Sequence, residues 1–459
     1  METMENKNKE FLSRLENSIP GGAHTYSKGS DQYPENAPAI LSHGKGAYVF
    51  DIDGNKYLDY GMGLKSVVLG YNYKKVSRAA IKALKLGNNL SKPSLIELEA
   101  AEKMISLIPG AEMVKFAKNG SNVTTAAIKM ARAYNKRKYV CVPTQQPFFS
   151  FDDWFIGSTQ LERGVPYEHS SLTLKFEFNN IGSLNELFEL HPGEISAVIL
   201  EPSTHISPCS IKCEEKGTNI HTCVTCPNIG ENFLSQVEQV CKRNDAVLIF
   251  DEMRTGFRWD IGGAQKYFGI KPDLSTFGKA IANGFSLAAL VGKKEIMDLA
   301  GIKDIGAERT FLLSSTHGAE MSSLGAFLAT ADIFEKEQVS SHLWKYGSEL
   351  KKVINTTSKE LGIESYFHAT GPDVCFELTA NGENMKDSNS YKTLFLQEMV
   401  RNRVLMTFIA PSFSHKEKEL EITYNAVKNS LKIYADALNF GIEKYLVGQP
   451  TKPVFRKYN

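Results

Sequence analysis

Hydrophobic and polar positions alternate between two periods along the middle of the chain. Short apolar runs at residues 139–142, 197–200 and 246–250 are typical of strands buried on both faces. Between such runs, apolar residues recur three or four positions apart, as in the segment from Val123 to Tyr134. Strands and helices that alternate from about residue 74 to about residue 290 predict a mainly parallel sheet with helices on both faces.

The N-terminal segment has a different pattern. A short helix is expected over residues 11–18, where Pro20-Gly21-Gly22 ends it. Two apolar runs, at residues 47–50 and 56–60, flank the dipeptide Asp53-Gly54. This dipeptide between two such runs is a strong signal for a hairpin turn.

Toward the C-terminus the helical patterns lengthen, and shorter strands are expected at residues 373–378 and 405–409. The order of elements predicts an α/β fold with two domains. We expect a large domain with the parallel sheet over residues 74–323. Residues 1–73 and 324–459, from both chain ends, are expected to build a smaller α+β domain.

Charge and composition narrow the range of partners. The 459 residues include 53 Lys and Arg against 52 Asp and Glu, for a net charge of +1. A chain without a basic surplus is not expected to bind nucleic acid or an anionic membrane surface. No apolar run approaches the roughly 20 residues of a membrane span, and residues 1–10 do not resemble a signal peptide. We therefore expect a cytoplasmic protein.

Two polar residues stand out against apolar surroundings. Asp251 follows the apolar run 246–250, and the carboxyl ends of parallel strands are where α/β sheets bind ligands. A loop or capping role would explain Asp251 equally well. A single lysine is usually solvated, but Lys279 stands beside Phe277, Gly278 and Ala280, so it is a candidate for an amine that works in a pocket.

A third feature lies upstream of these two. Asn119-Gly120-Ser121-Asn122 directly precedes the helical pattern that begins at Val123. Small and polar residues at a helix N-terminus offer N–H groups and a hydroxyl to a phosphate, although simple N-capping is the competing interpretation. One ligand needs a phosphate site, an amine for its aldehyde and a carboxylate for its pyridine nitrogen. That ligand is pyridoxal phosphate.

With these features in this order, the chain resembles the class III (fold type I) pyridoxal-phosphate-dependent aminotransferases. Within them it is similar to the branch of glutamate-1-semialdehyde aminomutases. The resemblance runs from Pro20 to about Ala435, and its most specific segments are residues 249–258 and Phe277-Gly278-Lys279. It implies a fold type I transferase with a large cofactor-binding domain and a smaller α+β domain.

The resemblance also implies roles for individual residues. Lys279 would form the Schiff base with the cofactor and then move a substrate proton. Asp251 would pair with the pyridine nitrogen, and Met253 would lie against one face of the ring. The implied phosphate contacts are Asn119, Gly120, Ser121, Ser315 and Thr316. Thr316 would reach the phosphate of the neighbouring subunit, which implies a homodimer with shared active sites.

Two segments depart from the family pattern. Phe148-Phe149-Ser150 stands where relatives have Tyr-His-Gly, although Phe148 can still stack on the cofactor ring. Lys28 stands where the aminomutases hold the arginine that grips the substrate carboxylate. A compact ammonium cannot reproduce that bidentate grip. Lys28 is therefore our candidate substrate contact.

These departures favour an aminotransferase that moves an amino group between an amino donor and a small anionic carbonyl acceptor. An intramolecular aminomutase of the glutamate-1-semialdehyde type is the alternative, and it would need no added donor. A non-catalytic, metal-stabilised binding protein on the same scaffold is a further alternative. It would be expected to lack Lys279 or Asp251, and the sequence contains both.

An insertion over about residues 203–228 contains four of the chain's seven cysteines. They are Cys209, Cys213, Cys223 and Cys226, spaced C-x3-C-x9-C-x2-C. Both pairs have the spacing of zinc ligands, so a structural zinc site is one interpretation and a loop with four free thiols is the other. The pattern leaves both open.

Overall fold

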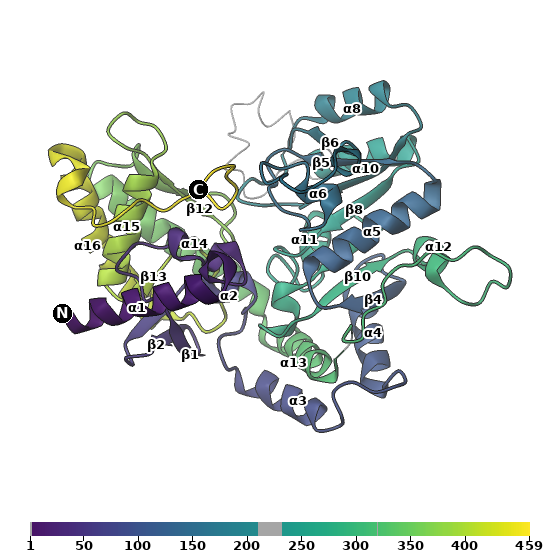
Figure 1. The fold of residues 1–459 in the computed structure, drawn as a ribbon, viewed down its shortest axis with the longest axis horizontal. Coiled ribbons are helices and arrows are strands. Elements are labelled where there is room, and N and C mark those ends of the chain that lie inside the picture. Colours follow the sequence, from purple (N-terminus) through teal and green to yellow (C-terminus); the bar gives the residue numbers. More distant parts are fainter. Residues whose placement is uncertain (1, 210–231, 319) are drawn as a thin grey trace. The chain divides into compact units, whose positions relative to one another are not determined.

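The computed structural model describes residues 2–209, 232–318 and 320–459 (Figure 1). The chain divides into two compact units, and each is described by itself. The large unit comprises residues 74–340 and 455–459, and the small unit comprises residues 1–73 and 341–454. Within the described ranges, no helix is both long enough and apolar enough to cross a membrane.

A seven-stranded sheet in the order β4-β10-β9-β8-β7-β5-β6 forms the centre of the large unit. Its strand β10 is antiparallel to both of its neighbours, and the remaining pairs are parallel. Because β4 and β9 both oppose β10, they run in the same direction. All strands except β10 therefore end at one edge of the sheet. The strands are β4 (Met113–Ala117), β5 (Tyr139–Pro143), β6 (Thr173–Phe176), β7 (Ile195–Leu200), β8 (Val247–Asp251), β9 (Leu274–Phe277) and β10 (Ala288–Gly292).

The apolar runs of the sequence correspond to the central strands. Every residue of β7, β8 and β9 is buried, which is why β7 and β8 are largely apolar on both faces. Ile249 belongs to a core cluster with residues of helix α5 (Gly120–Asn135). Cys241 of helix α10 (Phe233–Arg243) is buried, and burial, Asp273 and then Cys141 of β5 raise the pKa of its thiol. Helices thus cover both faces, and the predicted mainly parallel sheet is confirmed.

The large unit extends beyond residue 323, where its end was expected. Helix α13 packs against α3 so closely that a Cβ on Gly325 would lie 2.9 Å from the carbonyl oxygen of Ala79. This packing assigns α13 to the large unit, which continues to Ser340. Its helices are α3 (Lys74–Leu84), α4 (Leu95–Leu107), α5 (Gly120–Asn135), α6 (Asp153–Ile156), α7 (Tyr167–Ser170), α8 (Ile181–Leu190), α10 (Phe233–Arg243), α11 (Gly263–Phe268), η5 (Lys279–Ala282), α12 (Lys294–Met297), η6 (Asp298–Ala300) and α13 (Met321–Glu337).

The small unit combines both ends of the chain. Its four-stranded sheet has the order β1-β2-β3-β13, and β11 pairs with β12 in a separate hairpin. The expected turn at Asp53-Gly54 connects β2 to β3, which are antiparallel. The elements are α1 (Glu2–Ser18), η1 (Pro20–Gly22), η2 (Tyr26–Lys28), η3 (Ser30–Gln32), β1 (Leu41–Lys45), β2 (Tyr48–Asp51), β3 (Lys56–Asp59), α2 (Met62–Lys65), α14 (Val339–Glu360), β11 (Phe367–Thr370), β12 (Glu377–Ala380), α15 (Asn389–Arg401), β13 (Val404–Leu405), α16 (Glu417–Phe440) and η7 (Ile442–Lys444).

Two expected strands of the small unit were wrong in extent. Most of the segment 373–378 forms a turn in which the Cys375 N–H donates to the Pro372 carbonyl at 2.9 Å, and the strand begins only at Glu377. The segment 405–409 contributes only the end of β13, because its partner β3 ends at Asp59. An apolar run forms a strand only as far as a neighbouring strand offers hydrogen bonds.

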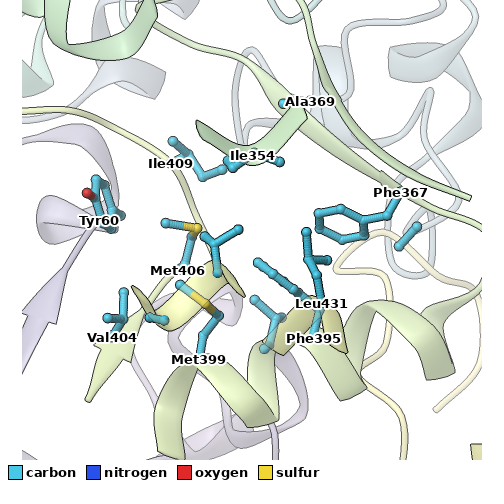
Figure 2. Close-up of a cluster of buried hydrophobic side chains, with 14 of the residues drawn as sticks. Tyr60, Ile354, Phe367, Ala369, Phe395, Met399, Val404, Met406, Ile409 and Leu431 are labelled. Carbon is cyan, nitrogen blue, oxygen red and sulfur yellow. The ribbon is translucent and has the colours of Figure 1, made fainter. Parts of the chain in front are cut away.

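The core of the small unit is a cluster of side chains from β11, α15, α16 and β13 (Figure 2). The rings of Phe367 and Phe395 lie 4.5 Å apart between centroids. Tyr60 brings a hydroxyl into this core, and that group hydrogen-bonds Tyr346 and Thr423 at 2.7 Å each. The buried polar atom is therefore satisfied.

Candidate active site

Residues from four strands of the large unit meet at the carboxyl edge of its sheet. Asp251 is the last residue of β8, and Glu201 directly follows β7. Asn119 and Lys279 each lie two residues beyond a strand, β4 and β9 respectively. Because these strands are parallel, the sheet brings together residues that are far apart in sequence. Ligands bind at this edge in α/β sheets.

Asp251 is buried, with 2% of its surface exposed. Its Oδ1 atom accepts hydrogen bonds from the Met253 N–H at 2.9 Å and from the Thr276 hydroxyl at 3.1 Å. Burial and the nearby charge of Glu201 raise the pKa of this carboxyl, and the positive charge of Lys279 lowers it. Its other oxygen, Oδ2, accepts none of the hydrogen bonds recorded among the described residues. An oxygen in this state suits a protonated ring nitrogen.

Lys279 is half-buried and begins the short helix η5. Its backbone has φ of +46°, a left-handed conformation that costs a residue with a Cβ about 1–2 kcal/mol. Such strain persists where the surrounding structure holds it, and it concentrates at functional sites. Since the Lys279 charge acts on Asp251, the structure places the predicted amine and carboxylate in one site.

Met253 lies between two glycines of this edge. A Cβ on Gly278 would come within 2.6 Å of the Met253 sulfur, and one on Gly120 would come within 3.0 Å. A side chain larger than glycine at either position would force the Met253 side chain to move. The two glycines place the Met253 side chain between the N-terminus of α5 and the start of η5.

The N-terminus of α5 provides both capping and N–H groups for an anion. The helix begins at Gly120, three residues before the predicted start at Val123. Asn119 is its N-cap, and its Oδ1 accepts from the Asn122 N–H at 3.0 Å. Ser121 is buried, and its Oγ accepts from the Phe151 N–H at 3.1 Å, so its hydroxyl proton can still be donated. First-turn N–H groups have no acceptor within a helix, and the donors suit a phosphate.

The two phenylalanines of the divergent segment have different environments. Phe149 is 2% exposed and packs edge-on against Phe155 at 5.3 Å. Phe148 is 44% exposed, and its ring lies 6.1 Å from that of Phe455. The first aromatic residue is thus accessible to a ligand, whereas the second belongs to the core.

The remaining predicted residues are placed as follows. Ser315 and Thr316 are exposed, and the Thr316 carbonyl accepts from Asn89 Nδ2 at 3.0 Å. Lys28 is an exposed residue of η2 in the small unit.

The zinc prediction finds no support in the described part of the chain. Cys209 is buried, and its N–H donates to Asn179 Oδ1 at 3.0 Å. Cys213, Cys223 and Cys226 lie outside the described residues. Among residues inside the described ranges, no group of three His, Cys, Asp or Glu side chains could hold a metal.

Sequence reasoning missed three residues of this edge. Glu201 is 2% exposed, and Arg254 Nε lies 3.5 Å from its Oε2 atom. Gln146 holds the Glu201 backbone with two hydrogen bonds of 2.7 Å. Glu201 could have been found by the rule that found Asp251, because it also ends an apolar run. No local pattern pointed to Arg254 or Gln146.

Comparison with known proteins gives consistent results. A profile of the family described as "Aminotransferase class-III" matches residues 30–387. The 3-aminobutyryl-CoA aminotransferase of Cloacimonas acidaminovorans is 29% identical, covering 90% of this chain and 94% of the relative. The glutamate-1-semialdehyde 2,1-aminomutase of Archaeoglobus fulgidus is 31% identical, covering 93% and 99%.

Solved structures share the fold at lower identity. The FumI protein of Sphingopyxis sp. MTA144, in its PLP internal aldimine form, superposes with a TM-score of 0.82. It is 22% identical and the match covers 97% of this chain and 99% of FumI. A glutamate-1-semialdehyde aminomutase from Pseudomonas aeruginosa has a TM-score of 0.78 at 17% identity, with coverage of 94% and 95%.

Proposed function

The chain belongs to the class-III aminotransferases and has their fold type I architecture. We therefore propose that it transfers an amino group between an amino donor and a small anionic carbonyl acceptor. The observation that carries the proposal is that Asp251 and Lys279 lie at the carboxyl ends of the paired strands β8 and β9, beside the N-terminus of α5. The family depends on pyridoxal phosphate, and these groups fit it.

Each part of the cofactor has a counterpart in the large unit. The N–H groups and hydroxyl at Gly120 and Ser121 would hold its phosphate. Asp251 would hold a proton on the pyridine nitrogen, because a buried carboxylate favours a cation beside it. Met253 and Phe148 would lie against the ring. Pyridoxal phosphate, when bound, supplies an aldehyde that condenses with amines and a ring that withdraws electrons.

Lys279 is the group that would move protons. Its amine would hold the cofactor through the aldehyde, and the same amine is the base that would accept and later return a proton at the substrate's reacting carbon. A half-buried amine at a strained backbone position is preorganised for this transfer.

Self-association would complete the site. Exposed leucines follow one another from the loop after α3 into the start of α4, among them Leu86, Leu95 and Leu98, which are 61%, 70% and 55% exposed. The same stretch contains Asn89, whose side chain holds the Thr316 backbone. Large apolar side chains that stand out together mark an interaction surface. We assign this surface to a second copy of the chain, with Thr316 directed to that copy's phosphate site.

An intramolecular aminomutase remains the second candidate, because a relative of that name is 31% identical. The two reactions differ in whether a separate amino donor is consumed. Lys28 favours the transferase, since a lysine cannot grip a carboxylate through two parallel hydrogen bonds as an arginine does.

The decisive experiment is a donor and acceptor screen on the purified protein with added pyridoxal phosphate. We expect conversion of an anionic carbonyl compound only when an amino donor is present. Conversion of glutamate-1-semialdehyde to 5-aminolevulinate without a donor would establish the aminomutase instead. The Lys279→Ala variant is the control, and neither reaction should proceed with it.

A further inference from the structure

Three carboxylates crowd at the ends of β7 and β8. Leu200 pairs with Phe250 across these parallel strands, so the next residues, Glu201 and Asp251, stand side by side. Glu252 follows at once, and all three side chains are buried. Neighbouring buried carboxylates cannot all ionise unless something offsets their charge.

Glu252 has its own compensation. One of its oxygens accepts from the Ala264 N–H at 2.9 Å and the other from the Gln265 N–H at 2.7 Å, and the Thr255 hydroxyl adds a third hydrogen bond. These two N–H groups belong to the start of α11. Glu252 is therefore occupied in holding that helix.

Among the described residues, Arg254 forms an ion pair with Glu201, whereas Lys279 acts on the neighbouring Asp251. The Glu201 side chain is 3% exposed, and Arg254 Nε lies 3.5 Å from its Oε2. The Gln146 side chain donates to the Glu201 carbonyl and accepts from the Glu201 N–H, which holds the Glu201 backbone in place beside Asp251. A buried carboxylate held in this way depends on its cation for compensation.

We propose that Arg254 and Glu201 form a positioning pair for the reaction: Arg254 offsets the charge of Glu201, so that Asp251 stays ionised and can hold the cofactor's ring nitrogen. This inference rests on the proposed function and adds two residues to it. Arg254 acts on Asp251 through Glu201, and neither member of the pair is assigned a contact with substrate.

The charged groups that act on the Asp251 carboxylate are few. Glu201 acts from the side of β7, and Lys279 acts from the side of β9. On one face of the sheet, α5 contributes apolar side chains such as Val123 and Ala127 to the core cluster that includes Ile249. On the other face, the charged residue Glu238 of α10 raises the pKa of Cys241, and it is not among the groups that act on Asp251. Glu201 is thus the anion whose compensation decides the charge of Asp251.

The experiment compares wild type with Arg254→Met, Glu201→Gln, the double variant and Arg254→Lys. Cofactor affinity is measured from pH 5 to 9 by quenching of the apoprotein's tryptophan fluorescence, together with the pH profile of kcat/KM. Lys138→Met is the matched control, because it breaks a half-exposed ion pair with Glu194 (2.9 Å) in the same unit.

The expected shifts have opposite signs. Without Arg254 the uncompensated Glu201 makes Asp251 harder to ionise, so the pH below which cofactor affinity falls should rise by about one unit in Arg254→Met. In Glu201→Gln the same pH should fall, because the charge of Arg254 is then not offset and favours the ionised form of Asp251. The double variant should return close to wild type, and Arg254→Lys should keep most of the wild-type profile because it retains the charge.

Several results would overturn the inference. One is an Arg254→Met curve that coincides with wild type. Another is a double variant that shifts as far as Arg254→Met, and a third is an Arg254→Lys variant that behaves like Arg254→Met. The proposed function itself fails in a different way: wild type would then bind no pyridoxal phosphate that borohydride attaches to Lys279.

Discussion

At the scale of single residues, the site depends on environments that change ordinary side chains. Asp251 is a carboxyl whose pKa burial raises, so its charge has to be maintained by its neighbours. Lys279 is a lysine at a position where most residues with a Cβ would be strained. Neither property is visible in the residue type alone.

We expect Lys279→Ala to reduce activity by roughly 10²- to 10⁴-fold, because the change removes the amine proposed to move the proton. Borohydride should attach the cofactor to wild type and not to this variant, as measured by mass spectrometry of peptides. Asp251→Asn should still bind the cofactor but lose roughly 10²- to 10³-fold in activity, because the amide cannot stabilise a positive ring nitrogen. Wild-type turnover in Lys279→Ala would exclude this mechanism.

Lys28 gives a second prediction at this scale. If it contacts an anionic group of the substrate, Lys28→Ala removes a charge-assisted contact of about 1.5–3 kcal/mol, which corresponds to a rise in KM of roughly 10- to 100-fold. Cofactor uptake should not change. Lys56→Ala, a change in another exposed lysine of the small unit, is the control. A KM equal to that of wild type would remove Lys28 from the substrate site.

At the scale of elements, α5 anchors the aromatic segment that follows β5. Two successive threonines of α5 hydrogen-bond this segment. Thr124 donates to the Phe149 carbonyl at 2.8 Å, and Thr125 donates to the Asp152 carboxylate at 2.6 Å. Thr125 also accepts from the Trp154 indole at 2.8 Å. One helix therefore orients both the predicted phosphate site and the accessible ring of Phe148.

Thr125→Val should loosen this anchoring. The change keeps the side chain's shape but leaves the Trp154 N–H and the Asp152 carboxylate without their shared partner, at a cost of about 1–3 kcal/mol in the free energy of unfolding. Cofactor affinity should fall with it. Thr330→Val is the matched control, because the Thr330 hydroxyl donates only to a carbonyl one turn back within α13. Equal effects of the two changes on cofactor affinity would contradict this assignment.

At the scale of the whole molecule, the exposed leucines at the start of α4 require an explanation. Leu95 and Leu98 lie one turn apart and are both more than half exposed. Apolar side chains in this state favour association with another surface. These leucines follow Asn89, whose side chain donates to the Thr316 carbonyl. Association of two chains at this surface would therefore also complete the proposed cofactor site.

We expect the double change Leu95→Asp and Leu98→Asp to convert a dimer to a monomer, measured by light scattering after size-exclusion chromatography. The buried like charges would repel across the interface. The monomer should also bind pyridoxal phosphate more weakly. Leu190→Asp, at a 72% exposed position on α8, is the control and should remain dimeric. A wild-type protein that is monomeric at all concentrations would refute the proposed interface.

Much of the fold and of the candidate site was predictable from local sequence. Strands buried on both faces are mostly apolar, so β5, β7 and β8 appear as apolar runs in the sequence. Asp251 and Lys279 were found because a charged residue among apolar neighbours, just beyond a strand, contributes little to packing. The N-terminus of α5 was found because capping residues stand in fixed positions before a helix.

Only the tertiary structure decided the relations between distant residues. The pairing of β7 with β8 places Glu201 beside Asp251, and that register depends on the packing of the whole sheet. The same packing buries Phe149 and exposes Phe148, two identical residues with identical local propensities. Pairing between strands also decides that β13 ends at Leu405, opposite Asp59 at the end of β3. The local sequence determines the chemistry of each side chain. The burial and the partners of that side chain depend on contacts between segments that are far apart in the sequence.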